Sequence, residues 1–224
     1  MSTSPDRLRL EAKREAAPAV GLALGVLVLL ALVSWAEHWE VLHRVRWWAW
    51  LLLAIPEIIL LLDFSFGRVA RTRRQARVLL GILVVGNIAG LVILVAGLVS
   101  TNTTQLSGGE LLLTGAAIWT TNVIVFGLWF WELDDGGPVV RSQHPRKTPD
   151  FQFSQDENPS LAREGWSPQV WDYLYVSLTN SIAFSPTDAM PLTLHAKASM
   201  ALGSVISVVA VLLVAARAVN VLGV

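Results

Sequence analysis

Several long apolar runs, each bounded by charged or turn-forming residues, constrain this chain more than any other feature. As an α-helix, about 20 apolar residues match the roughly 30 Å hydrocarbon core of a bilayer. Of the 224 residues, 54% are hydrophobic and only 15% are charged, whereas soluble domains carry about 25% charged residues. The runs and the composition together predict an integral membrane protein.

The apolar runs predict five transmembrane helices. These cover residues 19–35, 47–66, 78–100, 110–131 and 198–220. A further segment, residues 170–184, would be about 22 Å long as a helix, which is short for a full crossing. We therefore expect an all-α integral membrane protein with five transmembrane helices plus one short membrane-embedded helix, either re-entrant or a marginal sixth span.

The same pattern divides the chain into four regions. They are a charged N-terminal segment (1–17), a four-helix transmembrane scaffold (18–133), a polar loop (134–168), and a region (169–224) with the short helix and the final span. Prolines and a low apolar content predict that the polar loop has no packed core of its own.

An arginine-rich loop after the second predicted span gives the topology. Cytoplasmic loops are enriched in Lys and Arg, so this loop, the N-terminus and residues 134–168 are predicted to be cytoplasmic. The side of the C-terminus depends on whether residues 170–184 cross fully. The cluster also fits anionic lipid headgroups, and no nucleic-acid-binding fold accompanies it. Its members are Arg68, Arg71, Arg73, Arg74 and Arg77.

Several chemistries are disfavoured by the sequence. The chain has no cysteine, and its four histidines are far apart, which argues against thiolate sites and the usual metal-ligand spacings. No nucleotide-binding or hydrolase motif is present. An enzymatic reading would need a divalent-metal cluster, for which the sequence gives no mutual geometry. Its candidates are Asp134, Asp135, Asp172 and Asp188. We predict no catalytic residue, no metal and no cofactor.

Glu57 is the sharpest single candidate for an ion path. It follows Pro56 near the middle of the second predicted span, and an ionisable group inside a membrane is costly and often functional. Two readings stay open. Glu57 lies on an ion or proton path, or it is protonated or paired with Asn87, Asn122 or backbone freed by Pro56.

Polar residues at the end of the short helix form a second candidate group. They could ring a pore mouth, where an acidic ring favours cations, and monovalent cations are then the expected permeant species. The alternative is helix capping, with Asp188 stabilising a turn. The residues are Asn180, Ser181, Ser185, Thr187 and Asp188.

Two sets of small residues predict close helix packing. Gly86 and Gly90 form a G-x-x-x-G face in the third span, and Ser199, Gly203 and Ser207 form a stripe in the last. Packing within one chain is favoured for the glycine face. Subunit contact in a homo-oligomer is the alternative.

From Tyr175 onward the chain resembles the pore loop and inner helix of tetrameric potassium channels. Without gaps, the family's pore-helix Tyr and Ser fall on Tyr175 and Ser177, and its Asp after the filter falls on Asp188. The following Pro and Thr fall on Pro191 and Thr193, and the small-basic pair before the inner helix falls on Ala196-Lys197.

The filter itself departs from that family. Thr-Val-Gly-Tyr-Gly falls on residues 183–187, where both glycines are absent and Pro186 fixes φ. A ring of filter carbonyls needs conformations that glycine adopts freely. The predicted cytoplasmic side of the loop is a second departure. The resemblance therefore implies a channel-like segment without K⁺ selectivity.

The C-terminal part also resembles a large bacterial family of integral membrane proteins defined only as a domain of unknown function. The likeness rests on the aromatic fourth span, the Gly136-Gly137 loop, the segment Trp171–Thr179, the turn Phe184–Asp188 and the final helix. It implies a multi-pass protein of the bacterial inner membrane and assigns no activity.

We expect a channel-like or transporter-like protein, oligomeric, with a core formed by the short helix and the last span. The alternative is a non-transporting membrane interaction or stress-related protein, in which the same polar residues cap and pack helices.

Overall fold

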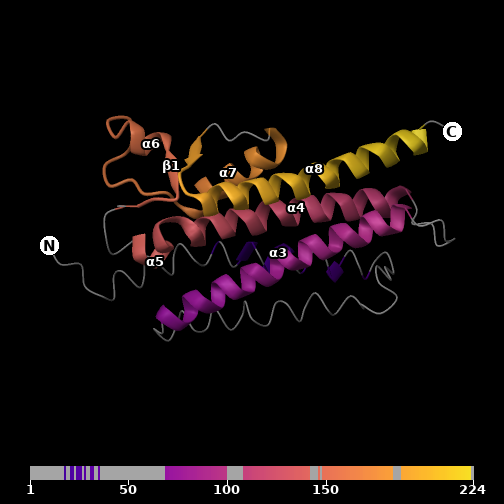
Figure 1. Ribbon diagram of the computed structural model, residues 1–224, viewed down its shortest axis with the longest axis horizontal. Coiled ribbons are helices and arrows are strands. Elements are labelled where there is room, and N and C mark those ends of the chain that lie inside the picture. The colour runs from indigo at the N-terminus through magenta and orange to yellow at the C-terminus, as the bar shows by residue number, and fades with distance from the viewer. Residues whose placement is uncertain are drawn as a thin grey trace.

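The computed structural model describes residues 69–99, 108–141, 146, 148–183 and 188–222, with scattered helical positions between 18 and 35. This part of the chain is mostly helical. Its three long helices are α3 (Val69–Val99), α4 (Gly108–Leu133) and α8 (Leu194–Leu222). In Figure 1, α4 runs in the direction opposite to α3 and α8.

Helix α4 is the centre of the packing and contacts α3, α8 and the short helix α7 (Val170–Ala183). Its second half is rich in aromatic and β-branched residues, which bury large apolar areas when they face neighbouring helices. Phe126 and Phe130 are almost completely buried. From α8, Ala196, Ile206 and Ala210 join the same core.

Short elements gather where α4 ends and α8 begins (Figure 1). They are the 3₁₀ turn η1 (Asp134–Gly136), α5 (Pro138–Arg141), β1 (Phe151–Phe153), α6 (Ser154–Glu157) and β2 (Ala189–Pro191). Strands β1 and β2 pair antiparallel, with Phe151 opposite Pro191 and Phe153 opposite Ala189. Both phenylalanines are buried in the core. The fold is therefore not purely helical.

The prediction of five transmembrane helices plus one embedded helix is wrong for the described residues. Two segments there are long and apolar enough to cross a membrane, Gly115–Gly136 and Leu194–Ala216, and the apolar stretch Leu80–Val92 in α3 is shorter. At about 1.5 Å per residue, Leu80–Val92 spans about 20 Å, which is less than the roughly 30 Å hydrocarbon core. The predicted span 47–66 lies outside the described residues, as does most of 19–35.

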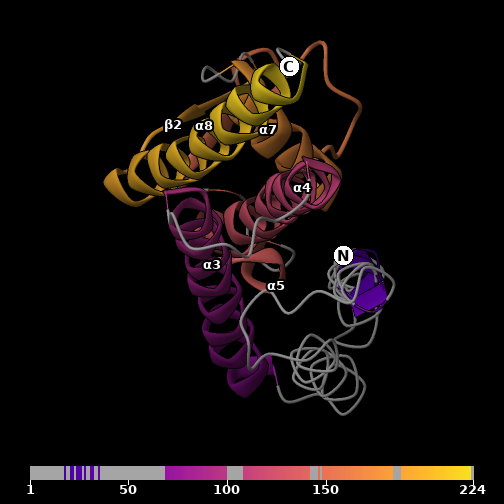
Figure 2. The same ribbon diagram turned by 90° about the vertical axis from the view of Figure 1, so that its right-hand side faces the viewer.

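The segment from α7 to β2 enters and leaves at one end of the bundle. Tyr173, in the first turn of α7, bonds to Asp134 at the end of α4. Further along α7, Asn180 bonds to the carbonyl of Met200, which is about 9 Å into α8 from Leu194. The chain then returns, because β2 pairs with β1 at the first end. Helix α7 lies beside the first part of α8 in both views (Figure 1 and Figure 2).

Candidate functional site

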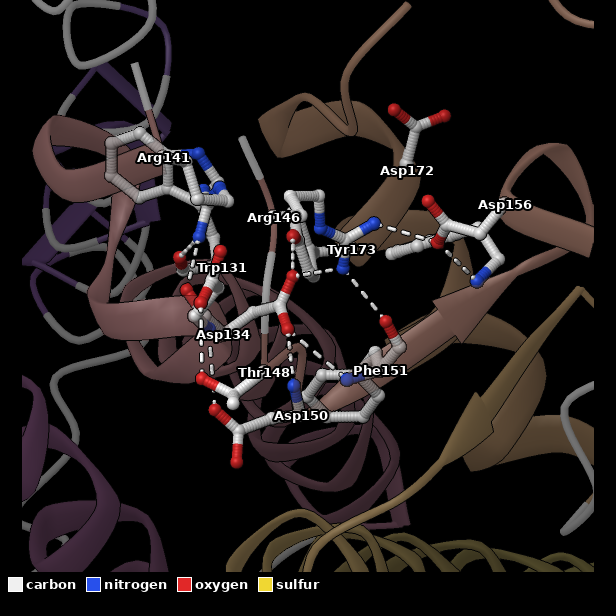
Figure 3. A network of polar contacts seen from close by, with 12 residues as sticks. Trp131, Asp134, Arg141, Arg146, Thr148, Asp150, Phe151, Asp156, Asp172 and Tyr173 are labelled. Atoms are coloured by element: carbon white, nitrogen blue, oxygen red, sulfur yellow. Dashed lines mark hydrogen bonds and ion pairs between the residues drawn. The ribbon is translucent and has the colours of Figure 1, made fainter. Parts of the chain in front are cut away.

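Asp134 is the hub of a buried polar network at the end of α4 (Figure 3). Its side chain is fully buried. Oδ1 accepts hydrogen bonds from the backbone N–H groups of Asp150, at 2.7 Å, and Phe151, at 3.1 Å. Oδ2 accepts from Arg146 Nη2 at 2.7 Å and from the Tyr173 hydroxyl at 2.5 Å. Four donors thus satisfy a carboxylate that would otherwise be costly to bury.

A tight turn ends α4 directly after Asp134. Asp135, Gly136 and Gly137 all have positive φ, at 45°, 84° and 91°. Glycine adopts this region without steric cost, so the pair Gly136-Gly137 stops the helix and turns the chain back. At Gly137 a Cβ would also lie only 3.1 Å from the Glu132 carbonyl oxygen. The turn leaves Asp134 pointing toward β1 and α7.

Arg146 neutralises two carboxylates. Its guanidinium lies 2.7 Å from Asp134 and 2.7 Å from Asp156, and it also donates to the carbonyl of Phe151. Burial alone lowers the pKa of Arg146, but the negative charges of Asp134 and Asp156 outweigh it and raise that pKa above its ordinary value. Arg146 is therefore a permanent positive charge beside Asp134.

Asp150 extends the network from α4 to α8. Its carboxylate accepts from the Thr193 hydroxyl at 2.5 Å and from the backbone N–H of Asp135 at 3.2 Å. Its own carbonyl accepts from the N–H of Leu192 at 2.8 Å. Thr193 also accepts from the N–H of Ala196, as a helix cap does. Asp150 therefore holds the residues that lead into α8.

Tyr173 has an aromatic shell and a polar tip. Its ring packs edge-on against Phe151 and Phe153, and the Arg141 guanidinium lies 5.2 Å from the ring centroid. Burial raises the pKa of Tyr173 well above its ordinary value, the positive charge of Arg141 opposes that shift, and Asp134 adds to it. The phenol stays protonated and donates to Asp134.

The basic start of α3 lies at the same end of the bundle. Arg77 Nε is 3.7 Å from Glu132 Oε1, near the end of α4. Arg74 and Arg77 are both exposed. Nothing is described of the side chains of Arg71 and Arg73, and Arg68 lies outside the described residues.

A second cluster of polar residues lies inside the bundle, between α3 and the two candidate spans. Asn122 is fully buried, and its amide nitrogen donates to the Gly203 carbonyl at 2.8 Å and to Ser207 Oγ at 2.7 Å. Asn87 donates to Asn122 Oδ1 at 3.4 Å. These bonds tie α3, α4 and α8 together.

Of the predicted pore-mouth residues, the structure buries Asn180 and Ser181 and exposes Asp188. Asn180 donates to the Met200 carbonyl at 3.0 Å, and its own carbonyl accepts from Ser204. The backbone oxygen of Asp188 accepts from the N–H of Ser154. Ser185, Thr187 and Glu57 lie outside the described residues, so the structure brings together only part of this group.

The two predicted packing faces differ in how closely neighbouring side chains approach them. A Cβ at Gly86 would meet nothing within 4 Å, and one at Gly90 would make only ordinary contact with Ile118. On α8, a Cβ at Gly203 would lie 3.1 Å from the ring of Phe126. Ser199 accepts from the Trp129 indole at 3.0 Å, and Ser207 bonds Asn122.

No sequence motif singles out the Asp134–Arg146–Tyr173 group. The sequence offers Asp134 only as a candidate metal ligand, and the described residues contain no group of three or more His, Cys, Asp or Glu side chains placed to hold a metal ion. Gly127 was also missed, although its Cβ position lies 2.7 Å from Leu174 Cδ2. One available signal was an acidic residue directly after an apolar helix.

No family model matches the chain, and neither a curated protein nor a solved structure does. The resemblances to potassium-channel pore loops and to the bacterial family therefore stay predictions. The function is inferred from the geometry.

Proposed function

We propose that this is a membrane protein of the channel-like or transporter-like class, in which α7 and α8 border an ion route. One observation carries the proposal. The segment from α7 to β2 enters and returns at the same end of the bundle, beside a helix long enough to span a membrane. A short helix followed by a return of the chain and a long inner helix is the order of elements in a pore loop.

The surface of α8 supports a lipid environment. It carries several exposed large apolar side chains, which in water would be costly over so long a helix. They are Leu202, Val205, Val211 and Leu212. With Gly115–Gly136, this helix gives the multi-pass insertion that we propose. The exposed Arg74 and Arg77 support the proposal that their end of the bundle is cytoplasmic, and we propose that the N-terminus lies there too, in a bacterial inner membrane.

The buried polar face of α7 supports a pore role. Non-helical backbone at membrane depth is tolerated where it is buried in protein or lines a water-filled cavity. The buried face of α7 carries Ser177, Asn180 and Ser181, while Trp171 and Ile182 are exposed on its outer face. A homo-oligomer would cover that outer face. Monovalent cations fit the acidic Asp188 best, and K⁺ selectivity is not proposed.

Ion flux tests the proposal directly. The purified protein is reconstituted in liposomes under K⁺, Na⁺ and H⁺ gradients, beside Asp188→Asn, Glu57→Gln and the control Asp172→Asn. A further control, Glu157→Gln, changes an exposed acidic residue on α6, outside α7 and α8. We expect cation flux that Asp188→Asn or Glu57→Gln reduces several-fold and Glu157→Gln leaves unchanged, while Asp172→Asn shows what loss of the α7 cap does, because Asp172 accepts from the N–H of Gln169.

A second candidate has its own supporting observation. Asn180 and Asn122 are satisfied by backbone and side-chain partners within the chain, as in a helix bundle that carries no ion. In this alternative the protein is a non-transporting membrane interaction protein. Absence of flux for every gradient, from a folded and correctly inserted sample, would reject the channel proposal in favour of this alternative.

A further inference from the structure

Two carboxylates join the beginning of α7 to the residue that precedes α8. Tyr173, in the first turn of α7, donates to Asp134. Thr193, the residue before α8, donates to Asp150. The two acids are linked because the N–H of Asp150 donates to Asp134 Oδ1 at 2.7 Å. We name Asp134 and Asp150 the carboxylate clasp.

Helix α7 needs such an anchor. It has 14 residues, and isolated helices of about 12–15 residues are marginal in water. Its position therefore depends on tertiary contacts. At its start the hydroxyl of Tyr173 is buried against Asp134, and at its other end Asn180 bonds to α8.

The contacts of the clasp couple the position of Thr193 to that of Tyr173. Asp134 is fully buried and Arg146 neutralises it. Each member of the relay from Tyr173 to Thr193 is within 2.7 Å of the next. Asp150 is fixed from a third side by the N–H of Asp135. Displacing Thr193 would therefore move Asp150 and, through it, the surroundings of Tyr173.

We propose that Asp134 and Asp150 act together as positioning residues that hold the start of α7 and the start of α8 as one unit. This inference rests on the proposed function, since α7 and α8 border the proposed ion route, and it names the residues that set their relative position. Neither acid touches the route itself.

A single tyrosine reports on the clasp. The chain has two tyrosines, Tyr173 and Tyr175, and Tyr175 is exposed. In the Tyr175→Phe protein, the near-ultraviolet absorbance of tyrosinate therefore follows Tyr173 alone as the pH is raised. The groups that face this phenol are Asp134, Arg141 and Arg146.

The test compares two threonines. Thr193→Val removes the bond to Asp150, 20 residues from Tyr173 in the sequence. Thr179→Val is the matched control, because within the described part of the chain the Thr179 hydroxyl bonds only to carbonyls of its own helix. We expect Thr193→Val to lower the titration midpoint of Tyr173 by about half a pH unit or more, as the phenol becomes more hydrated. Thr193→Ser, which keeps the hydroxyl, restores the original midpoint.

Two results of the tyrosine titration would overturn the clasp. An unchanged midpoint in Thr193→Val, or an equal shift in Thr179→Val, overturns the clasp. If Thr193→Val does not fold, Asp150→Ala is titrated in the same background with the same expectation. The titration requires no ion movement, so wild-type protein without flux rejects the proposed function independently of this result. With flux present, Thr193→Val and not Thr179→Val is expected to change the permeability ratio of Na⁺ to K⁺.

Discussion

The hydroxyl of Tyr173 lies 2.5 Å from Oδ2 of Asp134, although 39 residues separate them in the sequence. This contact fixes the start of α7 against the end of α4, inside a shell formed by Phe151 and Phe153. With the pairing of β1 and β2, it brings both ends of the α7–β2 segment to one end of the bundle.

Removing the charge of Asp134 should strongly destabilise the protein. Asp134→Asn keeps the shape but leaves the largely buried Arg146 with only the partly exposed Asp156 as a charged partner. Breaking a buried ion pair costs about 3–5 kcal/mol. Asp156→Asn is the control, with an expected cost of about 1 kcal/mol or less. Denaturant unfolding in detergent measures both. Equal losses in the two variants would contradict the assignment of Asp134 as the hub.

The Tyr173 phenol should make the folded state sensitive to alkali. Its pKa is raised in the folded protein and is ordinary, 10.0, in the unfolded chain. The folded state therefore keeps a proton that the unfolded state releases. The corresponding stability is fully present below about pH 10 and is lost as the pH rises toward the folded-state pKa.

Tyr173→Phe should therefore be less stable at neutral pH, by about 1.5–3 kcal/mol for the lost bond to a charged group, yet show a weaker alkaline loss. Thermal unfolding across neutral to alkaline pH checks this, with Tyr175→Phe as the control. Parallel pH curves for Tyr173→Phe and the wild type would refute it.

The Asn122 amide should contribute to the association of α4 with α8. Asn122→Leu removes the bonds to the Gly203 carbonyl and Ser207. Interhelical hydrogen bonds in membranes average about 0.6 kcal/mol, up to about 1.7 kcal/mol, so we expect a loss of about 1–3 kcal/mol for the two. Thr121→Val is the control, because Thr121 bonds to the carbonyl of Ala117 in its own helix. Steric-trapping or detergent-denaturation assays measure the unfolding free energy of both variants. A larger loss in Thr121→Val than in Asn122→Leu would contradict this role.

Gly127 should tolerate no side chain. A Cβ there would lie 2.7 Å from Leu174 Cδ2 and 3.0 Å from Leu174 Cα, so Gly127→Ala forces α4 and α7 apart. Overpacking of this kind costs about 1–3 kcal/mol. Gly86→Ala is the matched control on α3, where a Cβ meets nothing within 4 Å, and it should be neutral or slightly stabilising. The melting temperatures of the two variants test this prediction. An unchanged melting temperature in Gly127→Ala would contradict the close approach of Gly127 to Leu174.

Local features could be predicted from the sequence more readily than the site. The short helix expected over residues 170–184 is found as α7, which runs from Val170 to Ala183. The signals for such a helix are local, since capping and periodicity act within a few residues. The number of spans was wrong because a run of apolar letters does not fix the length of the apolar stretch in the folded helix, and in α3 that stretch covers only Leu80–Val92.

The Asp134 network could not be predicted in the same way. Its partners Arg146, Asp150 and Tyr173 are 12, 16 and 39 residues away, and only the tertiary fold selects them. The antiparallel pairing of β1 with β2 was hidden for the same reason, because each strand has three residues and little intrinsic preference. A buried polar hub becomes visible only once its apolar shell is assembled.

The most direct test of the proposed ion route uses the absence of native cysteine, because it asks whether both ends of the α7–β2 segment are reached from one side of the membrane. A single cysteine is placed at each of three exposed positions. Ser167 lies just before α7, His195 lies at the start of α8, and Ala216 lies near the far end of α8. Each is labelled with a membrane-impermeant thiol reagent in vesicles of known orientation. The structure predicts that Ser167→Cys and His195→Cys react from the same side and Ala216→Cys from the other. Reaction of Ser167→Cys and His195→Cys from opposite sides would mean that residues 170–184 cross the membrane, and would contradict the account.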